Sequence, residues 1–123
     1  MLTLKDIQAA RDRIAPHIVR TPLLRVPALD DLLGCEVYLK PENLQYTGSF
    51  KLRGALSRLL TLTEEEKKRG VVCASSGNHA QGVAYGAQKL GIDALIVMPS
   101  NCNPVKLQGV ESYGAKAILA GTK

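Results

Sequence analysis

The sequence predicts an α/β fold with a parallel sheet of at least three strands flanked by helices. Three short runs, residues 71–74, 94–98 and 117–120, are apolar at every position, and segments of helical periodicity separate them. One glycine precedes each run, so the unit repeats about every 22 residues. Strands of this kind are typical of a parallel sheet covered on both faces, with right-handed crossover connections between neighbours.

The composition fits a single ordinary globular domain. The chain has 123 residues, of which 46% are hydrophobic and 22% charged, and this allows one modest core. One Phe, four Tyr and no Trp leave few aromatic platforms on which single-stranded nucleic acid could stack. The net charge of +5 is spread along the chain, and the one basic run, 67–69, follows three glutamates. We therefore expect no nucleic-acid partner.

The cysteines indicate a reducing environment. Cys35, Cys73 and Cys102 are odd in number and lack the spacing of metal ligands, so we expect neither a disulfide framework nor a metal site. Residues 1–15 contain no apolar stretch of signal-peptide type, and no run approaches the roughly 20 apolar residues of a membrane span. These features predict a cytoplasmic protein without a membrane partner.

The first third of the chain is predicted to be an arm or packing segment. Thr3 is placed as the N-cap of a helix that Pro16 ends. Residues 20–35 are rich in turn-forming residues. A short extended run is expected at 36–40, where Pro41 stops it.

From residue 51 onward the pattern predicts regular structure. Thr63 and Glu66 form the capping-box signature of a short helix ending at residue 70. Further helices are predicted over 78–90 and 104–114, each bounded by cap residues. The first helix of this part presents an apolar face made of Leu52, Ala55, Leu56 and Leu59.

Lys51 is the first candidate for chemistry, because a polar, glycine-containing loop leads directly into the helix that it starts. The positive end of the helix dipole disfavours an ammonium group there. An uncharged lysine amine can form a Schiff base with a carbonyl compound. An ordinary exposed lysine whose stem packs on the helix fits the same position, so position alone leaves both interpretations open.

The second candidate is the loop 75–77 with the helix start that follows it. Unpaired backbone N–H groups at a helix N-terminus bind carboxylates and phosphates, and small loop residues let a ligand approach them. In open α/β sheets ligands bind beyond the carboxyl ends of the strands, where this loop must lie. Plain helix capping by Ser or Asn is the alternative. His79, in the first helical turn, is either a hydrogen-bond donor to a ligand or a structural histidine.

Together these two segments resemble a known enzyme family. Residues 47–55, TGSFKLRGA, resemble the pyridoxal-phosphate lysine motif of the serine/threonine dehydratases, and residues 75–82, SSGNHAQG, are similar to their substrate-carboxylate loop. The segments 21–23 (TPL) and 97–99 (VMP) also resemble segments of this family. The resemblance covers the whole chain and is strongest to the threonine dehydratases (threonine ammonia-lyases), whose fold is the tryptophan-synthase-β-like one, called fold type II.

The resemblance implies a pyridoxal 5′-phosphate cofactor and a role for each matching residue. Lys51 would hold the cofactor as a Schiff base and remove the substrate α-proton. Phe50 would pack on the pyridine ring, and Asn78 would hydrogen-bond its phenolic oxygen. The substrate carboxylate would be surrounded by Ser75, Ser76, Gly77, Asn78 and His79. The implied reaction converts L-threonine or L-serine to 2-oxobutanoate or pyruvate and ammonia, within amino-acid metabolism such as isoleucine biosynthesis.

The resemblance also implies a missing part. Family members are considerably longer, and their phosphate-binding glycine loop has no counterpart here. Residues 1–45 would be an N-terminal arm belonging to the large domain, and 46–123 most of the small domain. The chain ends three residues after its third apolar run, so we expect it to be the front part of a longer fold and to be inactive alone.

Two other functions stay open. Ser76 matches the position of a serine that serves as acid and base in serine racemases, so a racemase-like enzyme is one alternative. A non-catalytic truncated chain that folds without doing chemistry is the other. For either enzyme we expect a small amino acid as the substrate and a homo-oligomeric assembly.

Overall fold

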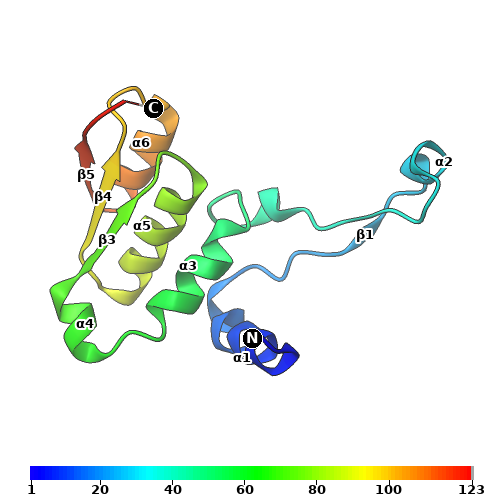
Figure 1. Ribbon diagram of the computed structural model, residues 1–123, viewed down its shortest axis with the longest axis horizontal. Coiled ribbons are helices and arrows are strands. Elements are labelled where there is room, and N and C mark those ends of the chain that lie inside the picture. Colours follow the sequence, from blue (N-terminus) through cyan, green and yellow to red (C-terminus); the bar gives the residue numbers. More distant parts are fainter. Residues whose placement is uncertain (123) are drawn as a thin grey trace.

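The parallel sheet lies at one end of the molecule, and a two-stranded arm extends from the other (Figure 1). The computed structural model describes residues 1–122. The sheet has the order β3-β4-β5, and both strand pairs are parallel. Its strands are β3 (Val71–Ala74), β4 (Ala94–Met98) and β5 (Lys116–Leu119). The predicted α/β fold is confirmed, with the third strand one residue earlier than expected.

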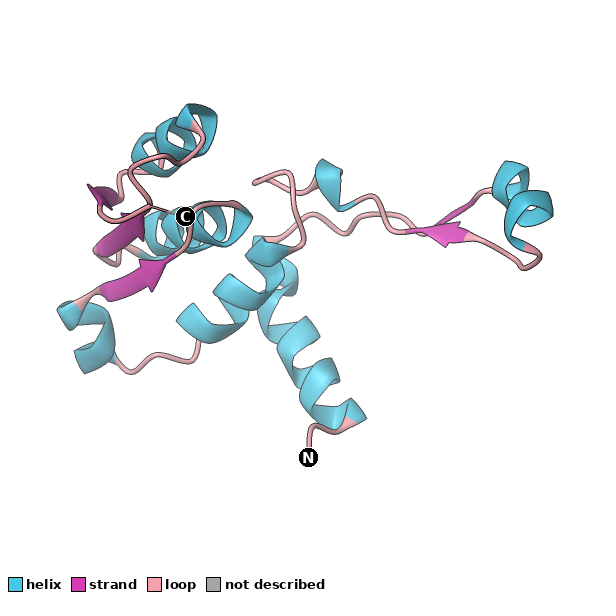
Figure 2. Cartoon of the chain, turned by 45° about the horizontal axis from the view of Figure 1, so that its top comes forward, coloured by secondary structure: helices cyan, strands magenta, loops and turns pink. Residues whose placement is uncertain are grey.

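Helices cover one face of this sheet. The two crossover helices, α5 (Asn78–Leu90) and α6 (Pro104–Ser112), lie on the same side (Figures 1 and 2). Strand order follows chain order, so two right-handed crossovers necessarily place both helices on one side. Val72, on the other side, is 72% exposed. The prediction that helices cover both faces of the sheet is therefore wrong for residues 1–122.

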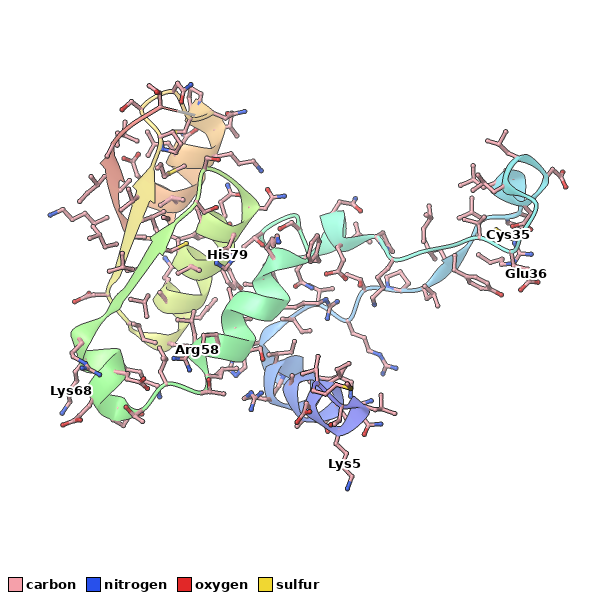
Figure 3. The ribbon with its side chains drawn as sticks, in the orientation of Figure 1. Lys5, Cys35, Glu36, Arg58, Lys68 and His79 are labelled. Carbon is pink, nitrogen blue, oxygen red and sulfur yellow. The ribbon has the colours of Figure 1, made fainter. Side chains whose placement is uncertain are left out.

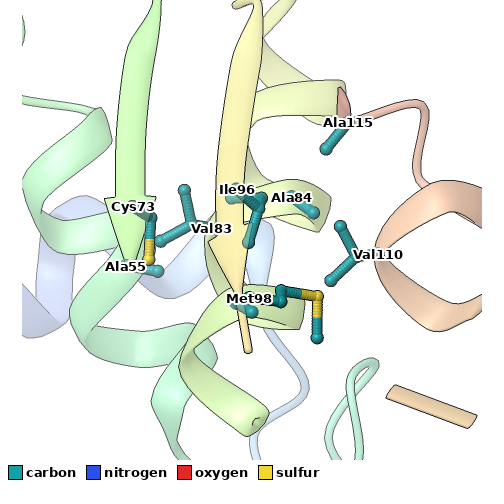
Figure 4. Packing of buried hydrophobic residues seen from close by; sticks show 9 residues of the cluster. Ala55, Cys73, Val83, Ala84, Ile96, Met98, Val110 and Ala115 are labelled. Carbon is teal, nitrogen blue, oxygen red and sulfur yellow. The ribbon is translucent and has the colours of Figure 1, made fainter. Parts of the chain in front are cut away.

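The core forms between the sheet and these helices. Figure 4 shows the largest cluster, in which Ile96, Met98 and Val110 are fully buried. Full burial of one such side chain contributes roughly 1.5–3 kcal/mol. A second cluster joins Ile14 to Leu52 and Leu56, and it ties the N-terminal helix α1 (Leu4–Ile14) to α3 (Lys51–Leu59).

Capping determines where several helices begin, as the sequence predicts. The Thr63 hydroxyl accepts from the backbone of Glu66, whose carboxylate accepts from the backbone of Thr63, and α4 (Glu64–Arg69) follows. Thr3 and Asp6 form the same capping box before α1. No helix within residues 1–122 has both the length and the apolar character needed to cross a membrane.

The arm holds more structure than its turn-rich sequence predicts. Strands β1 (Leu24–Arg25) and β2 (Tyr38–Leu39) pair antiparallel. The 3-10 helix η2 (Pro27–Leu29) and the short helix α2 (Asp30–Leu33) connect them. Two-residue strands show no alternating pattern, so β1 was missed and the expected run 36–40 is shorter than predicted. Two further 3-10 turns are η1 (Ala15–His17) and η3 (Glu42–Leu44).

Candidate active site

Helix α3 begins at Lys51, and this places a primary amine at a helix N-terminus, as predicted. The side chain is exposed, and its Nζ lies 4.9 Å from the centroid of the Phe50 ring. Phe50 is itself 58% exposed and does not cap the helix with its side chain. The amine is therefore accessible, with an aromatic face beside it.

Two hydroxyl groups in the preceding loop are buried without a partner. Thr47 Oγ1 and Ser49 Oγ form no hydrogen bond within the described part of the chain, although their residues are only 9% and 6% exposed. An unpaired buried hydroxyl costs about 1–3 kcal/mol. Gly48, between them, has a φ of +66° and open space around its Cα. The loop thus presents unused polar groups two and four residues before Lys51.

The loop after β3 leads to a second helix N-terminus. The backbone N–H of Ser75 donates to the Val97 carbonyl at 3.0 Å, and that of Gly77 donates to Ser75 Oγ at 3.3 Å. No side chain caps α5, so the N–H groups of its first turn are available to a ligand. A helix terminus of this kind attracts an anionic group.

Gly82 brings the two predicted segments together. It lies one turn after Asn78 on α5, and a Cβ at this position would be 3.2 Å from the Leu52 nitrogen and 3.3 Å from the Lys51 carbonyl carbon. A glycine here lets α5 approach the backbone of α3 closely. The start of α3 therefore lies against the second turn of α5, the helix that follows the loop 75–77.

Asn78 and His79 face different surroundings, although both are exposed. The Asn78 carboxamide oxygen accepts from Lys106 Nζ at 2.6 Å. His79 lines a cleft of about 460 Å³ between α3 and β3, together with Gly54 and Arg58 (Figure 3). His79 thus borders the cleft beside α3, whereas the side chain of Asn78 is held by Lys106 of α6. Sequence reasoning missed Lys106, which is 28 residues from its partner.

A polar clasp, also missed from sequence, anchors the first turn of α3. We use this name for the side chains of Thr21, Glu42 and Arg53. Arg53 Nε and Nη2 donate to the Glu42 carboxylate at 2.8 and 2.7 Å, and the Thr21 hydroxyl donates to the same group. The hydrogen bonds from Arg53 lower the pKa of Glu42 from 4.5 to about 2, despite its burial. The clasp ties the base of the arm to the helix that carries Lys51.

These groups fit an aldehyde cofactor together with an anionic substrate. The amine of Lys51 suits the aldehyde, and the uncapped terminus of α5 suits an anion. The carboxamide of Asn78 and the unpaired hydroxyls of Thr47 and Ser49 add hydrogen-bonding capacity. Within residues 1–122, no cluster of three or more His, Cys, Asp or Glu residues suits a metal ion.

Comparisons with known proteins find a family model that covers most of the chain. Residues 14–123 match the family described as "Pyridoxal-phosphate dependent enzyme". A catabolic L-threonine dehydratase of Staphylococcus aureus is 49% identical over 122 residues, and an L-threonine ammonia-lyase of Thermotoga maritima is 50% identical over 121. Both alignments cover 98% of this chain, which spans 35% and 30% of the length of those relatives.

Solved structures are similar in fold along the same length. A serine racemase from Dictyostelium discoideum superposes with a TM-score of 0.92 at 42% identity, covering 99% of this chain and 40% of that one. A threonine deaminase from T.th. superposes with a TM-score of 0.85 at 52% identity, covering 99% and 38%.

Proposed function

The chain belongs to the pyridoxal-phosphate-dependent enzyme family, and from this premise we propose that it supplies part of the active site of a threonine ammonia-lyase. That enzyme converts L-threonine to 2-oxobutanoate and ammonia, and L-serine to pyruvate and ammonia. The observation that carries the proposal is the contact at Gly82, where the backbone of Lys51 at the start of α3 lies against α5, whose N-terminus no side chain caps. A lysine and an anion-binding terminus on two packed helices suit an amino-acid substrate.

The roles follow from the chemistry of each side chain. When bound, pyridoxal phosphate supplies an electron sink for bonds broken at the substrate α-carbon. Lys51 Nζ would hold the cofactor covalently and would remove the substrate α-proton. Asn78 would donate a hydrogen bond to the ring oxygen, and Phe50, whose ring centroid lies 4.9 Å from Nζ, would pack on the pyridine ring.

The substrate carboxylate binds at the start of α5. Backbone N–H groups of its first turn and the hydroxyls of Ser75 and Ser76 donate to the carboxylate oxygens, and Gly77 keeps the approach open. His79, on the cleft side of the same turn, adds a donor at the edge of the site.

Turnover tests the proposal. In the natural protein that carries this sequence, purified with pyridoxal phosphate, we expect formation of 2-oxobutanoate from L-threonine. Lys51→Ala should reduce turnover by on the order of 1,000-fold or more, because both the attachment point and the base are lost. Lys68→Met removes an exposed lysine of α4 and should leave turnover unchanged. Undiminished turnover in Lys51→Ala would contradict the proposal.

Serine racemisation is the second candidate, and Ser76 favours it. The residue is half-buried in the loop after β3, and its hydroxyl has no hydrogen-bond partner within residues 1–122, so no other group of this part of the chain engages it. With L-serine as substrate, a racemase produces D-serine, whereas a dehydratase without racemase activity produces pyruvate alone. Ser76→Ala should abolish D-serine formation and leave pyruvate formation in place if the racemase hypothesis is correct.

We also propose the domain division that the resemblance implies. Residues 1–45 would belong to the larger domain and residues 46–123 to the smaller one. The exposed apolar side chains of the arm, among them Leu32 and Leu33, support contact with a further protein surface. The isolated 123 residues would then be inactive, and the complete enzyme would act as a homo-oligomer in cytoplasmic amino-acid metabolism such as isoleucine biosynthesis.

A further inference from the structure

We propose that Lys106 is a positioning residue that turns the Asn78 carboxamide so that its NH₂ group is presented to the cofactor ring. The proposal rests on the proposed function and deepens it, because it explains how a flexible amide at the start of α5 is held in one orientation. Lys106 belongs to α6, and the sequence motifs that predict the site do not include it.

The contact itself selects the orientation. Lys106 Nζ donates to Asn78 Oδ1 at 2.6 Å. A lysine ammonium has three donors and no acceptor, so it can bind only the oxygen of the carboxamide. The flipped amide would place its NH₂ hydrogens against the positive charge. The Nδ2 hydrogens therefore remain free to donate, and a donor is what a phenolic oxygen on the ring requires.

Helix packing holds the two residues in register. A Cβ at Gly109 of α6 would be 2.1 Å from Gln81 Nε2, so the Gln81 side chain lies directly over that glycine. Gln81 follows Asn78 by three residues, and Gly109 follows Lys106 by three, so each pair shares one helix face. The close approach of α6 to α5 at Gly109 therefore brings Lys106 opposite Asn78.

A lysine at this place can also act in another way, by binding an anionic ligand directly. The two roles differ in their dependence on Asn78. A lysine that acts through the carboxamide has no effect once the carboxamide is removed, whereas a lysine that binds a ligand keeps its effect. A double-mutant cycle separates them.

The cycle uses the pyridoxal-phosphate-loaded natural protein with Lys106→Met, Asn78→Ala and the double variant. We expect Lys106→Met to weaken pyridoxal phosphate binding by about threefold to tenfold, the range expected for one hydrogen bond. It should also shift the visible absorption band of the bound cofactor in the same direction as Asn78→Ala. Lys106→Arg should restore most of the affinity, and Lys68→Met is the control for the loss of one distant positive charge.

In the Asn78→Ala background, Lys106→Met should have no further effect on affinity or on the band. An equal loss in both backgrounds would overturn the proposal in favour of direct ligand binding, and no loss in either would overturn it outright. The Asn78 side-chain NH₂ resonances of ¹⁵N-labelled protein give a cofactor-free readout, which Lys106→Met must shift and Lys68→Met must not. That readout stands even if Lys51→Ala shows that the proposed function is wrong.

Discussion

The body of the molecule, residues 51–119, has a core of buried apolar side chains, whereas no side chain of the arm, residues 24–39, is fully buried. In the body, Leu52, Leu56 and Ile96 are completely buried. In the arm, Leu32 is 77% exposed and Tyr38 51% exposed, and the hairpin extends away from the body (Figure 1). The body therefore packs on itself, whereas the arm makes its main attachment through polar groups at its base.

This difference bears on the candidate site, because the site lies where the two regions meet. Lys51 and the loop 75–77 sit on packed helices of the body, where rigid elements fix their positions. The polar clasp of Thr21, Glu42 and Arg53 joins the base of the arm to the same helix turn. Hydrophobic packing thus builds the site, and the clasp connects it to the arm.

The largest loss of folding stability is expected when a buried apolar residue of the body is truncated. The same truncation of an exposed apolar residue in the arm is the comparison. Leu56→Ala should lower the free energy of unfolding by about 2–5 kcal/mol, because it leaves a cavity in the cluster with Ile14 and Leu52. Leu32→Ala, in the arm, should change it by less than about 0.5 kcal/mol. Urea unfolding followed by circular dichroism measures both. Equal losses would mean that the arm packs as tightly as the body.

Acid should loosen the junction before it unfolds the body. The pKa of Glu42 is depressed to about 2 by hydrogen bonds from Arg53, so the clasp contributes stability above pH 4.5. That contribution is lost as pH falls from about 4.5 to about 2, and it amounts to at most about 3 kcal/mol.

Glu42→Gln tests this assignment. The variant should be less stable than wild type at pH 7, and the difference should shrink toward pH 2, because protonation removes the charge from the wild type there. Unfolding free energies measured at several pH values give the comparison. A difference that is constant with pH would show that the Glu42 charge is not what holds the junction.

A smaller loss of stability is expected from Gly82→Ala, at the close contact between α3 and α5, and Gly54→Ala is its control. Gly82→Ala forces the Cβ against the backbone of Lys51 and Leu52, and it should cost about 1–3 kcal/mol of stability. Gly54→Ala, on the exposed side of α3, meets nothing within 4 Å and should stabilise the helix by about 0.5–1 kcal/mol. Thermal unfolding of both variants checks the sign of each change. A stabilising Gly82→Ala would mean that the two helices are free to move apart.

Sequence patterns predicted the body well because its elements carry local signals. Apolar runs mark the strands, and the Thr63 capping box marks the start of α4. The arm carried a weaker signal, since its strands have two residues each: the run 36–40 predicted β2, and β1 had no recognisable pattern. The bare outer face of the sheet was not foreseen either, because an apolar run does not reveal on which side the crossovers pack.

The candidate site was predictable in its parts and not in its connections. Both motifs were visible as segments, each at a predicted helix start. The contacts that hold these segments in place depend on tertiary packing. Gly82 packs against Lys51, Lys106 donates to Asn78, and Arg53 donates to Glu42. Pairs such as the last two are separated by 28 and 11 residues, and no periodicity relates them.

Covalent trapping of the cofactor tests the central claim most directly. The natural protein loaded with pyridoxal phosphate is reduced with borohydride, digested, and mapped by mass spectrometry. The account predicts that the reduced cofactor is attached to Lys51, at the start of α3, where the backbone of this residue packs against α5. Attachment to Lys40 or Lys106 with Lys51 unmodified would contradict it.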